Sequence, residues 1–172
     1  MSAEDSKPDD LSAAIRSVES KERRLELVVR IQNKAQRALH YIADVRTIGY
    51  DPTSKTLTLA LSDEGRQVIP GAIGKLPVFR HVDPASEAEI RVSVPDRVVK
   101  LSRSAPPGEL AFETQPLAEL REVVVEIAWA DVPYYEDTRL AAQDDARLPA
   151  ARWEQHKARA VKRQDKKRGP KG

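Results

Sequence analysis

Four segments of the chain show most clearly an alternation of apolar and polar residues with the period of a β-strand, and no other feature constrains the fold as tightly. They cover residues 25–31, 57–61, 88–94 and 123–129. Successive side chains of a strand point to opposite faces, so each segment has one face to bury. Turn-forming residues separate the segments, and strands do not alternate with helices, which argues against a parallel α/β sheet. The pattern predicts a mainly β domain, an antiparallel β-sandwich of about six to eight short strands.

The first of these segments lies within "RRLELVVRIQN", residues 23–33. Every second residue from Leu25 is apolar and β-branched residues are frequent, so we interpret the segment as a strand. A helix continuing from residue 11 is the alternative, because Leu25, Val28 and Val29 also share a helical face. Asn33 and Gln36 have the spacing of a capping box that would start a further helix.

A β-hairpin is predicted over residues 39–62, "LHYIADVRTIGYDPTSKTLTLALS". Alternating apolar residues run along both of its strands. Between them, Pro52 fixes φ at the first central position of a turn, and the Asp51 carboxylate can accept hydrogen bonds from the turn amides. Shorter strands are predicted at "RVVKL" and "LAFET", residues 97–101 and 110–114.

The N-terminal end leaves the strand rhythm. Leu11, Ile15 and Val18 follow the 3.6-residue period of a helix. We therefore predict an acidic, disordered N-terminal segment followed by a short helix within residues 1–22. The helix covers about residues 10–22.

The C-terminal end is strongly basic. Residues 151–172 hold nine Lys and Arg against two Asp and Glu, whereas the preceding 150 residues hold 20 against 25. Ala, Arg, Glu and Lys dominate residues 148–161, which favours a helix there, and the last ten residues are too charged to fold alone. We predict a β-sandwich at 23–137, followed by a linker and a basic, partly helical or disordered tail at 138–172.

The basic tail is one candidate site. Its cationic side chains are Lys157, Arg159, Lys162, Arg163, Lys166, Lys167, Arg168 and Lys171. Such a cluster neutralises phosphates and gives salt-sensitive binding to RNA or DNA without sequence preference. No base-reading motif accompanies it. A solvated tail and an acidic protein partner are the alternatives.

A second candidate site is the stretch "EVVVEIAWADVPYYEDTR", residues 122–139. Trp129 is in phase with the apolar residues before it, so we expect its indole to close the end of the core. Pro133 ends the strand pairing, and Tyr134 and Tyr135 cannot both face inward on an extended chain. Because Tyr and Trp often anchor protein interfaces, Trp129, Tyr134 and Tyr135 are the predicted partner-binding residues.

Most classes of catalytic site are excluded by the residues that the chain lacks. There is no cysteine, which rules out disulfides, thiolate nucleophiles and thiolate metal sites. The segment "PGAIGKL" has neither the spacing nor the Ser or Thr of a phosphate-binding loop, and no Gly-x-Ser-x-Gly elbow occurs. We predict no enzyme activity, no metal and no cofactor.

Two small groups of residues stay open as metal or catalytic candidates. His40 lies on a predicted strand, and His81 lies in a predicted loop near Asp83; neither has the spacing of a zinc motif. A carboxylate cluster follows the long apolar strand, where acids are usually solvated: Asp131, Glu136 and Asp137.

The beginning of the chain lacks the basic and apolar regions of a secretion signal. No window approaches the ~18 apolar residues that a membrane-spanning helix needs. We therefore expect a cytoplasmic protein without a membrane partner.

One resemblance concerns the rhythm of two segments, "LVVRIQNKAQRALHYIADV" and "VFRHVDPASEAEIRVSVP". Together they resemble bacterial immunoglobulin-like modules over roughly residues 25–130 (at the level of fold). The corner at residues 83–86 stands where those modules carry a glycine. The resemblance implies an adhesive, spacer or docking unit and transfers no catalytic residue.

These observations favour a non-enzymatic docking or scaffold module of a cytoplasmic assembly. The expected partner is a protein, bound at an edge strand or at the loop of Tyr134 and Tyr135. The alternative is a nucleic-acid-associated factor that is tethered by its basic tail.

Overall fold

The computed structural model describes residues 7–62, 77–101, 106–109, 111–117, 119–132 and 156–164. These residues are mostly β-strand, which confirms the predicted mainly β class. A 3-10 turn, Pro8–Asp10, precedes the first strand. The strands are β1 Leu11–Lys21, β2 Arg24–Asn33, β3 Leu39–Ile42, β4 Thr47–Asp51, β5 Thr56–Leu61, β6 Phe79–Val82, β7 Glu87–Pro95, β8 Arg97–Leu101, β9 Phe112–Pro116, β10 Glu122–Ala130 and β11 His156–Arg163. Within the described part of the chain, no helix has the length and apolar character needed to cross a membrane.

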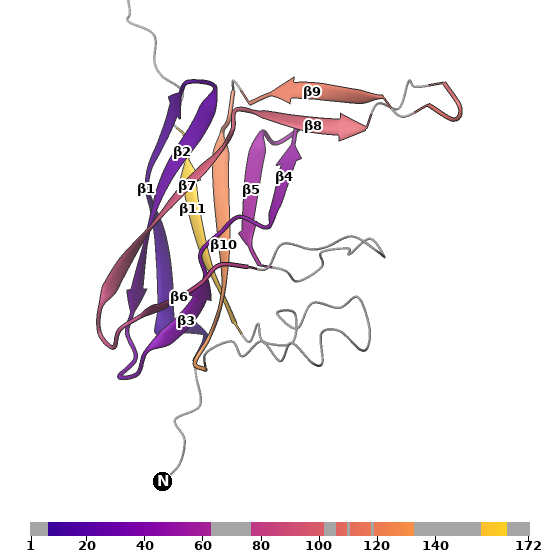
Figure 1. The fold of residues 1–172 in the computed structure, drawn as a ribbon. Helices are drawn as coiled ribbons and strands as arrows, with labels where there is room; N and C mark the ends of the chain where they lie inside the picture. The colour runs from indigo at the N-terminus through magenta and orange to yellow at the C-terminus, as the bar shows by residue number, and fades with distance from the viewer. Residues whose placement is uncertain are drawn as a thin grey trace, which may run out of the picture.

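Two sheets face each other (Figure 1). One has the antiparallel order β1–β2–β7. The other is built around β10, which pairs with β5 and β3 along one edge and with β11 along the other. β4 extends this sheet beyond β5, and β6 extends it beyond β3. The β5–β10 pair is parallel, whereas the other pairs among the described strands are antiparallel.

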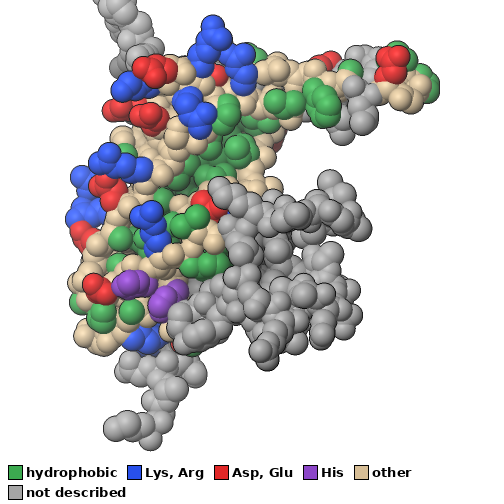
Figure 2. Space-filling model, in the orientation of Figure 1, with side chains coloured by type: hydrophobic (Ala, Val, Ile, Leu, Met, Phe, Trp, Pro, Cys, Tyr) green, Lys and Arg blue, Asp and Glu red, His purple; other side chains and the backbone are tan. Residues whose placement is uncertain are grey.

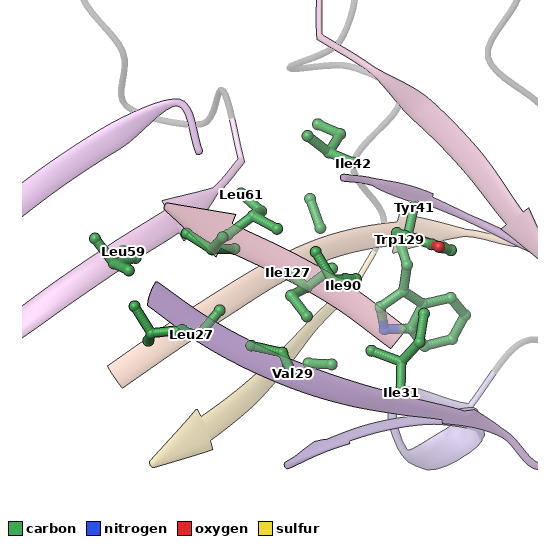
Figure 3. Close-up of a cluster of buried hydrophobic side chains, with 14 of the residues drawn as sticks. Leu27, Val29, Ile31, Tyr41, Ile42, Leu59, Leu61, Ile90, Ile127 and Trp129 are labelled. Carbon is green, nitrogen blue, oxygen red and sulfur yellow. The ribbon is translucent and has the colours of Figure 1, made fainter. Parts of the chain in front are cut away.

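The core lies between these two sheets. Figure 3 shows apolar side chains from both sheets meeting there. Among the most deeply buried, each at most 1 % exposed, are Leu27, Val29 and Ile31 of β2 and Leu59, Leu61, Ile127 and Trp129 of the second sheet. Every second residue of β2, β5, β7 and β10 points into this core, which confirms the alternation predicted for all four segments. Full burial of such side chains stabilises the fold by roughly 1.5–3 kcal/mol each.

The predicted helix over residues 10–22 is wrong, because residues 11–21 form strand β1. The register of β1 against β2 shifts just after Ile15, which makes Arg16 the extra residue of a β-bulge. Leu11, Ile15 and Val18 all pack on the core side of the strand. Regular alternation separates Leu11 from Ile15 by four residues, and the bulge then separates Ile15 from Val18 by three, so the apolar spacing is also that of a helix.

The predicted hairpin over residues 39–62 is confirmed in its second half. β4 and β5 are joined by the predicted turn, in which the Thr53 N–H donates to the Asp51 carboxylate at 2.9 Å. The predicted first strand is divided in two: β3 pairs with β10 and β6, whereas β4 lies on the outer side of β5. The chain thus steps outward between β3 and β4 and leaves room for β5 next to β10.

The predicted helix over residues 148–161 is wrong where the chain is described, since His156–Arg163 is strand β11. Ala158 and Ala160 face the core and are buried, and the basic residues between and beside them point outward. Both β1 and β11 belong to the sheets, so the sandwich extends beyond the predicted range 23–137 at both ends.

Candidate functional site

The hairpin of β8 and β9 leaves the body of the sandwich at one end (Figure 1). Its register pairs Arg97 with Pro116 at the base and Leu101 with Phe112 toward the tip. We call β8, β9 and the turn at residues 106–109 the arm. Among the described strands, those of the arm pair only with each other.

One face of the arm is apolar and open to solvent. Val99 is 61 % exposed and Phe112 is 65 % exposed, the highest values among the large apolar side chains of the described residues. Val99 lies opposite Thr114, two residues from Phe112, so these three residues share a face. By the same register Glu113 lies on the opposite face. Figure 2 shows hydrophobic side chains along the arm and on the body beside it.

The base of the arm is fixed to the sandwich by backbone hydrogen bonds. The Asp96 N–H donates to the Arg23 carbonyl at 3.0 Å, and the Leu117 N–H donates to the Asp96 carbonyl at 2.8 Å. Leu117 is buried, and Val98 packs partly against the core. The arm is therefore anchored at its base while its apolar face stays uncovered.

A tight turn lies at the far end of the arm. The Glu109 N–H donates to the Pro106 carbonyl at 3.0 Å. Pro107 and Gly108 occupy the central positions, and the φ of Gly108 is 88°. This is the geometry of a type II turn, in which proline suits the first central position and glycine the second.

The structure separates the predicted partner-binding residues. Trp129 is fully buried, and its ring packs against His156 with the ring centroids 4.6 Å apart. It closes the core, as its phase in the strand indicated, and presents no surface to a partner. Tyr134 and Tyr135 lie outside the described residues. Val132, shortly before them, is 48 % exposed.

Four of the eight cationic residues predicted in the basic tail belong to strand β11 of the sandwich. The residues in β11 are Lys157, Arg159, Lys162 and Arg163, and those outside the described residues are Lys166, Lys167, Arg168 and Lys171. Arg163 Nε lies 3.6 Å from the Glu122 carboxylate of β10. Lys162 Nζ donates to the Arg16 carbonyl of β1 at 3.5 Å. These two cations are thus engaged by the body of the protein.

His40 and His81 lie opposite each other on β3 and β6, with their ring centroids 6.0 Å apart. His81 is therefore on a strand and not in the predicted loop, and its Nε2 is 3.6 Å from Asp83 Oδ1. Burial is the larger cause that lowers the pKa of His40, and the charge of His81 lowers it further. No group of three or more His, Asp and Glu side chains in the described residues is placed to hold a metal ion.

The lowered pKa of His40 predicts a stability that declines in acid. Above about pH 6.5 the imidazole is neutral in both the folded and the unfolded chain. As the pH falls through that value, the unfolded chain takes up a proton before the folded one, so the free energy of unfolding decreases. We expect His40→Gln to reduce the decrease measured by urea unfolding between pH 7.5 and 5.5, and His81→Gln to reduce it less. An unchanged pH dependence in His40→Gln would contradict this assignment.

Asp131 is the member of the predicted carboxylate cluster that the structure describes. Its Oδ2 lies 3.9 Å from Arg37 Nε, and Arg37 also contacts the Asp10 carboxylate at 3.2 Å. These contacts connect the N-terminal turn, the loop after β2 and the end of β10. Glu136, Asp137 and the segment "PGAIGKL" lie outside the described residues.

The exposed residues of the arm were not singled out by the sequence. Val99 and Phe112 lie in segments predicted only as short strands. An apolar residue on a projecting hairpin follows the same alternation as one in a core strand, so the local pattern does not distinguish them. The available signal was an aromatic residue in a short strand close to a Pro-Pro-Gly turn.

Comparison of the chain with protein-family models, with curated proteins and with solved structures gives no match.

Proposed function

We propose that this protein is a non-enzymatic interaction module that docks another protein through the apolar face of the arm. The observation that carries the proposal is the exposure of Val99 and Phe112 on one face of an anchored hairpin. A contiguous apolar patch that is open to solvent often marks a protein–protein contact site. Aromatic residues are also enriched among the side chains that dominate binding energies.

The way in which the arm is built supports a docking role. A two-stranded hairpin is marginally stable alone and needs a hydrophobic face to be covered. In the arm the sandwich supports only the base, through Asp96 and Leu117. A partner that covers Val99 and Phe112 would supply the missing contact and bury the apolar surface that the sandwich leaves exposed.

The immunoglobulin-like character of the sandwich also stays a proposal. Two facing sheets with a shared apolar core support it. Within this sandwich β5 and β10 pair in parallel, and the C-terminal strand β11 is added beside β10.

The test is capture of a partner by the purified full chain, followed by affinity measurement with the purified partner. We expect the double variant Val99→Ser with Phe112→Ser to weaken binding by about 30-fold or more, the size of a typical hot-spot loss. The matched control is Val161→Ser, which replaces another exposed valine on β11. It should bind as the unmodified chain does.

Three outcomes would contradict the proposal. The arm variant binds as tightly as the unmodified chain, the Val161→Ser control loses affinity equally, or nuclease treatment abolishes capture. The last result would favour the nucleic-acid alternative, and truncation after Gln164 would then test the remaining basic residues without removing β11.

A further inference from the structure

The last strand reaches its place in the second sheet through a long connection. β10 and β11 are antiparallel neighbours, with Glu122 opposite Arg163 and Trp129 opposite His156. Two to five residues suffice to join such neighbours, yet 25 residues lie between Ala130 and His156. A connection of this length spans up to roughly 80 Å when extended. The connection is therefore long enough for β11 to pair with β10 of the same chain or with β10 of a second copy of the chain.

β11 contributes little apolar surface to the core. Its buried inward-facing residues are Ala158 and Ala160, which lie opposite Ile127 and Val125. A buried alanine removes far less apolar area from water than the Val, Ile and Leu of the neighbouring strands. Lys and Ala, which make up much of β11, are also depleted in strands generally. β11 is thus held by its backbone hydrogen bonds to β10, by the contact between the His156 and Trp129 rings and by the Arg163–Glu122 ion pair, with little burial of apolar surface.

Those hydrogen bonds run along one edge of β11 only. β1 lies along its other side, but no backbone hydrogen bond joins the two strands in the part of the chain that the structure describes. The bulge at Arg16 interrupts the edge of β1 there, and its carbonyl accepts from Lys162 Nζ at 3.5 Å. Release of β11 therefore breaks one ladder of backbone bonds instead of two.

The site along β10 matches β11 in charge and in size. Arg159 lies opposite Glu126, and Arg163 Nε is 3.6 Å from the Glu122 carboxylate. On the core side the matching positions hold alanines. A strand that replaces β11 has to alternate small residues with cations, and every further copy of this chain carries such a strand.

We propose that β11 exchanges between two copies of the chain, so that β11 of each copy completes the second sheet of the other. The exchanged pair keeps the contacts that β11 makes within one copy and forms a closed two-fold dimer. Concentration and the entropy of the connection then set the balance between monomer and dimer. The exchange does not involve the residues of the arm.

The test uses the absence of cysteine from the chain. One batch carries Glu126→Cys and a second, distinguished by a tag of different size, carries Arg159→Cys; these positions are register partners on β10 and β11. Register partners lie about 4.5–5.5 Å apart between Cα atoms, within the range that a disulfide spans. The control mixture carries Arg30→Cys and Glu89→Cys, register partners on β2 and β7.

After mixing at high concentration under oxidising conditions, we expect the β10/β11 mixture to form disulfide dimers that contain one copy of each batch. Their yield should exceed the control by about tenfold, because a paired strand holds the two thiols at millimolar or higher effective concentration. Combining Glu126→Cys and Arg159→Cys in one chain, and oxidising it at low concentration where the monomer predominates, should close an intrachain disulfide. That variant should lack the concentration-dependent dimer that light scattering detects for the cysteine-free chain.

The proposal is overturned if the β10/β11 mixture gives no more mixed dimer than the control, or if the cysteine-free chain stays monomeric at every concentration. Failure of the double variant to close its disulfide would also overturn it, because the register between β10 and β11 would then differ from that described.

Discussion

Replacing Asn33 by aspartate is expected to lower the free energy of unfolding by about 4 kcal/mol at pH 7, because a buried charge loses its partners and faces carbonyl oxygens. Asn33 is 1 % exposed at the end of β2. Urea unfolding followed by circular dichroism measures the loss as a shift of the midpoint at constant slope.

The carboxamide of Asn33 joins three parts of the chain. Its Nδ2 donates to the main-chain carbonyls of Arg37, Val82 and Asp83 at 2.7, 3.2 and 3.1 Å. Its Oδ1 accepts from the Ala35 N–H at 2.9 Å. These bonds fasten the end of β2 to the loop that follows it and to the corner between β6 and β7. A carboxylate keeps the bond from Ala35 but places an acceptor where three acceptors already point.

Two control variants separate charge from lost hydrogen bonds. Asn33→Ala removes the same bonds without adding a charge and should cost about 2–3 kcal/mol. Gln32→Ala, on the solvent-exposed face of the same strand, should stay within about 0.5 kcal/mol of the unmodified chain. The difference between Asn33→Asp and the unmodified chain should shrink as the pH falls toward 4, because a protonated carboxyl regains a donor. A difference that is independent of pH would show that the charge is not the cause.

Asn33 also illustrates which part of the fold the sequence predicts. The alternation of β2 predicted its buried face, which the structure confirms. The spacing of Asn33 and Gln36 predicts a helix cap, but the Asn33 side chain forms hydrogen bonds with the backbone of a non-helical loop and of the corner between β6 and β7. A helix cap would form a bond between the side chain and a nearby backbone N–H, and the bond from the Ala35 N–H is of that local kind although no helix follows. The carbonyls of Val82 and Asp83 are about 50 positions away in sequence and could not be read from local pattern.

The helix predicted over residues 10–22, which is strand β1 in the structure, was wrong for a different reason. Successive residues of a regular strand alternate, but the bulge at Arg16 inserts one residue and shifts the phase. The turn into β2 was also hidden, since Glu22 and Arg23 both have positive φ, 50° and 63°. Turns of this kind usually carry Asn or Gly. The strand pairing with β2 stabilises a conformation that neither residue favours alone.

β11 shows tertiary context overriding intrinsic propensity. Ala, Arg and Lys favour a helix in isolation, yet the edge of β10 offers a full ladder of backbone bonds and two acidic partners, Glu122 and Glu126. The apolar face of the arm was equally invisible in the sequence, since Val99 and Phe112 become a surface only because the hairpin projects from the body. In both places the location of the strand, and not its local pattern, decides its role.

The second large loss of stability is expected on substitution of Trp129. Trp129→Ala is expected to cost about 3–5 kcal/mol, the range for removing a large aromatic side chain from a packed core. The indole is fully buried, and Figure 3 shows it beside Tyr41 and Ile31 at one end of the core. Its ring also packs on His156, so its loss weakens the contact between β10 and β11.

Trp129→Phe should cost much less, about 1 kcal/mol, although it also removes a hydrogen-bond donor. The Nε1 of Trp129 is buried and has no hydrogen-bond partner among the described residues. Phenylalanine lacks this nitrogen, so the substitution breaks no hydrogen bond and removes an unsatisfied polar atom, which offsets part of the packing lost with the second ring. Urea unfolding of the two variants beside the unmodified chain measures both costs. Equal losses for Trp129→Phe and Trp129→Ala would mean that Nε1 forms a bond essential to the fold, and the indole would then be more than a filler of the core.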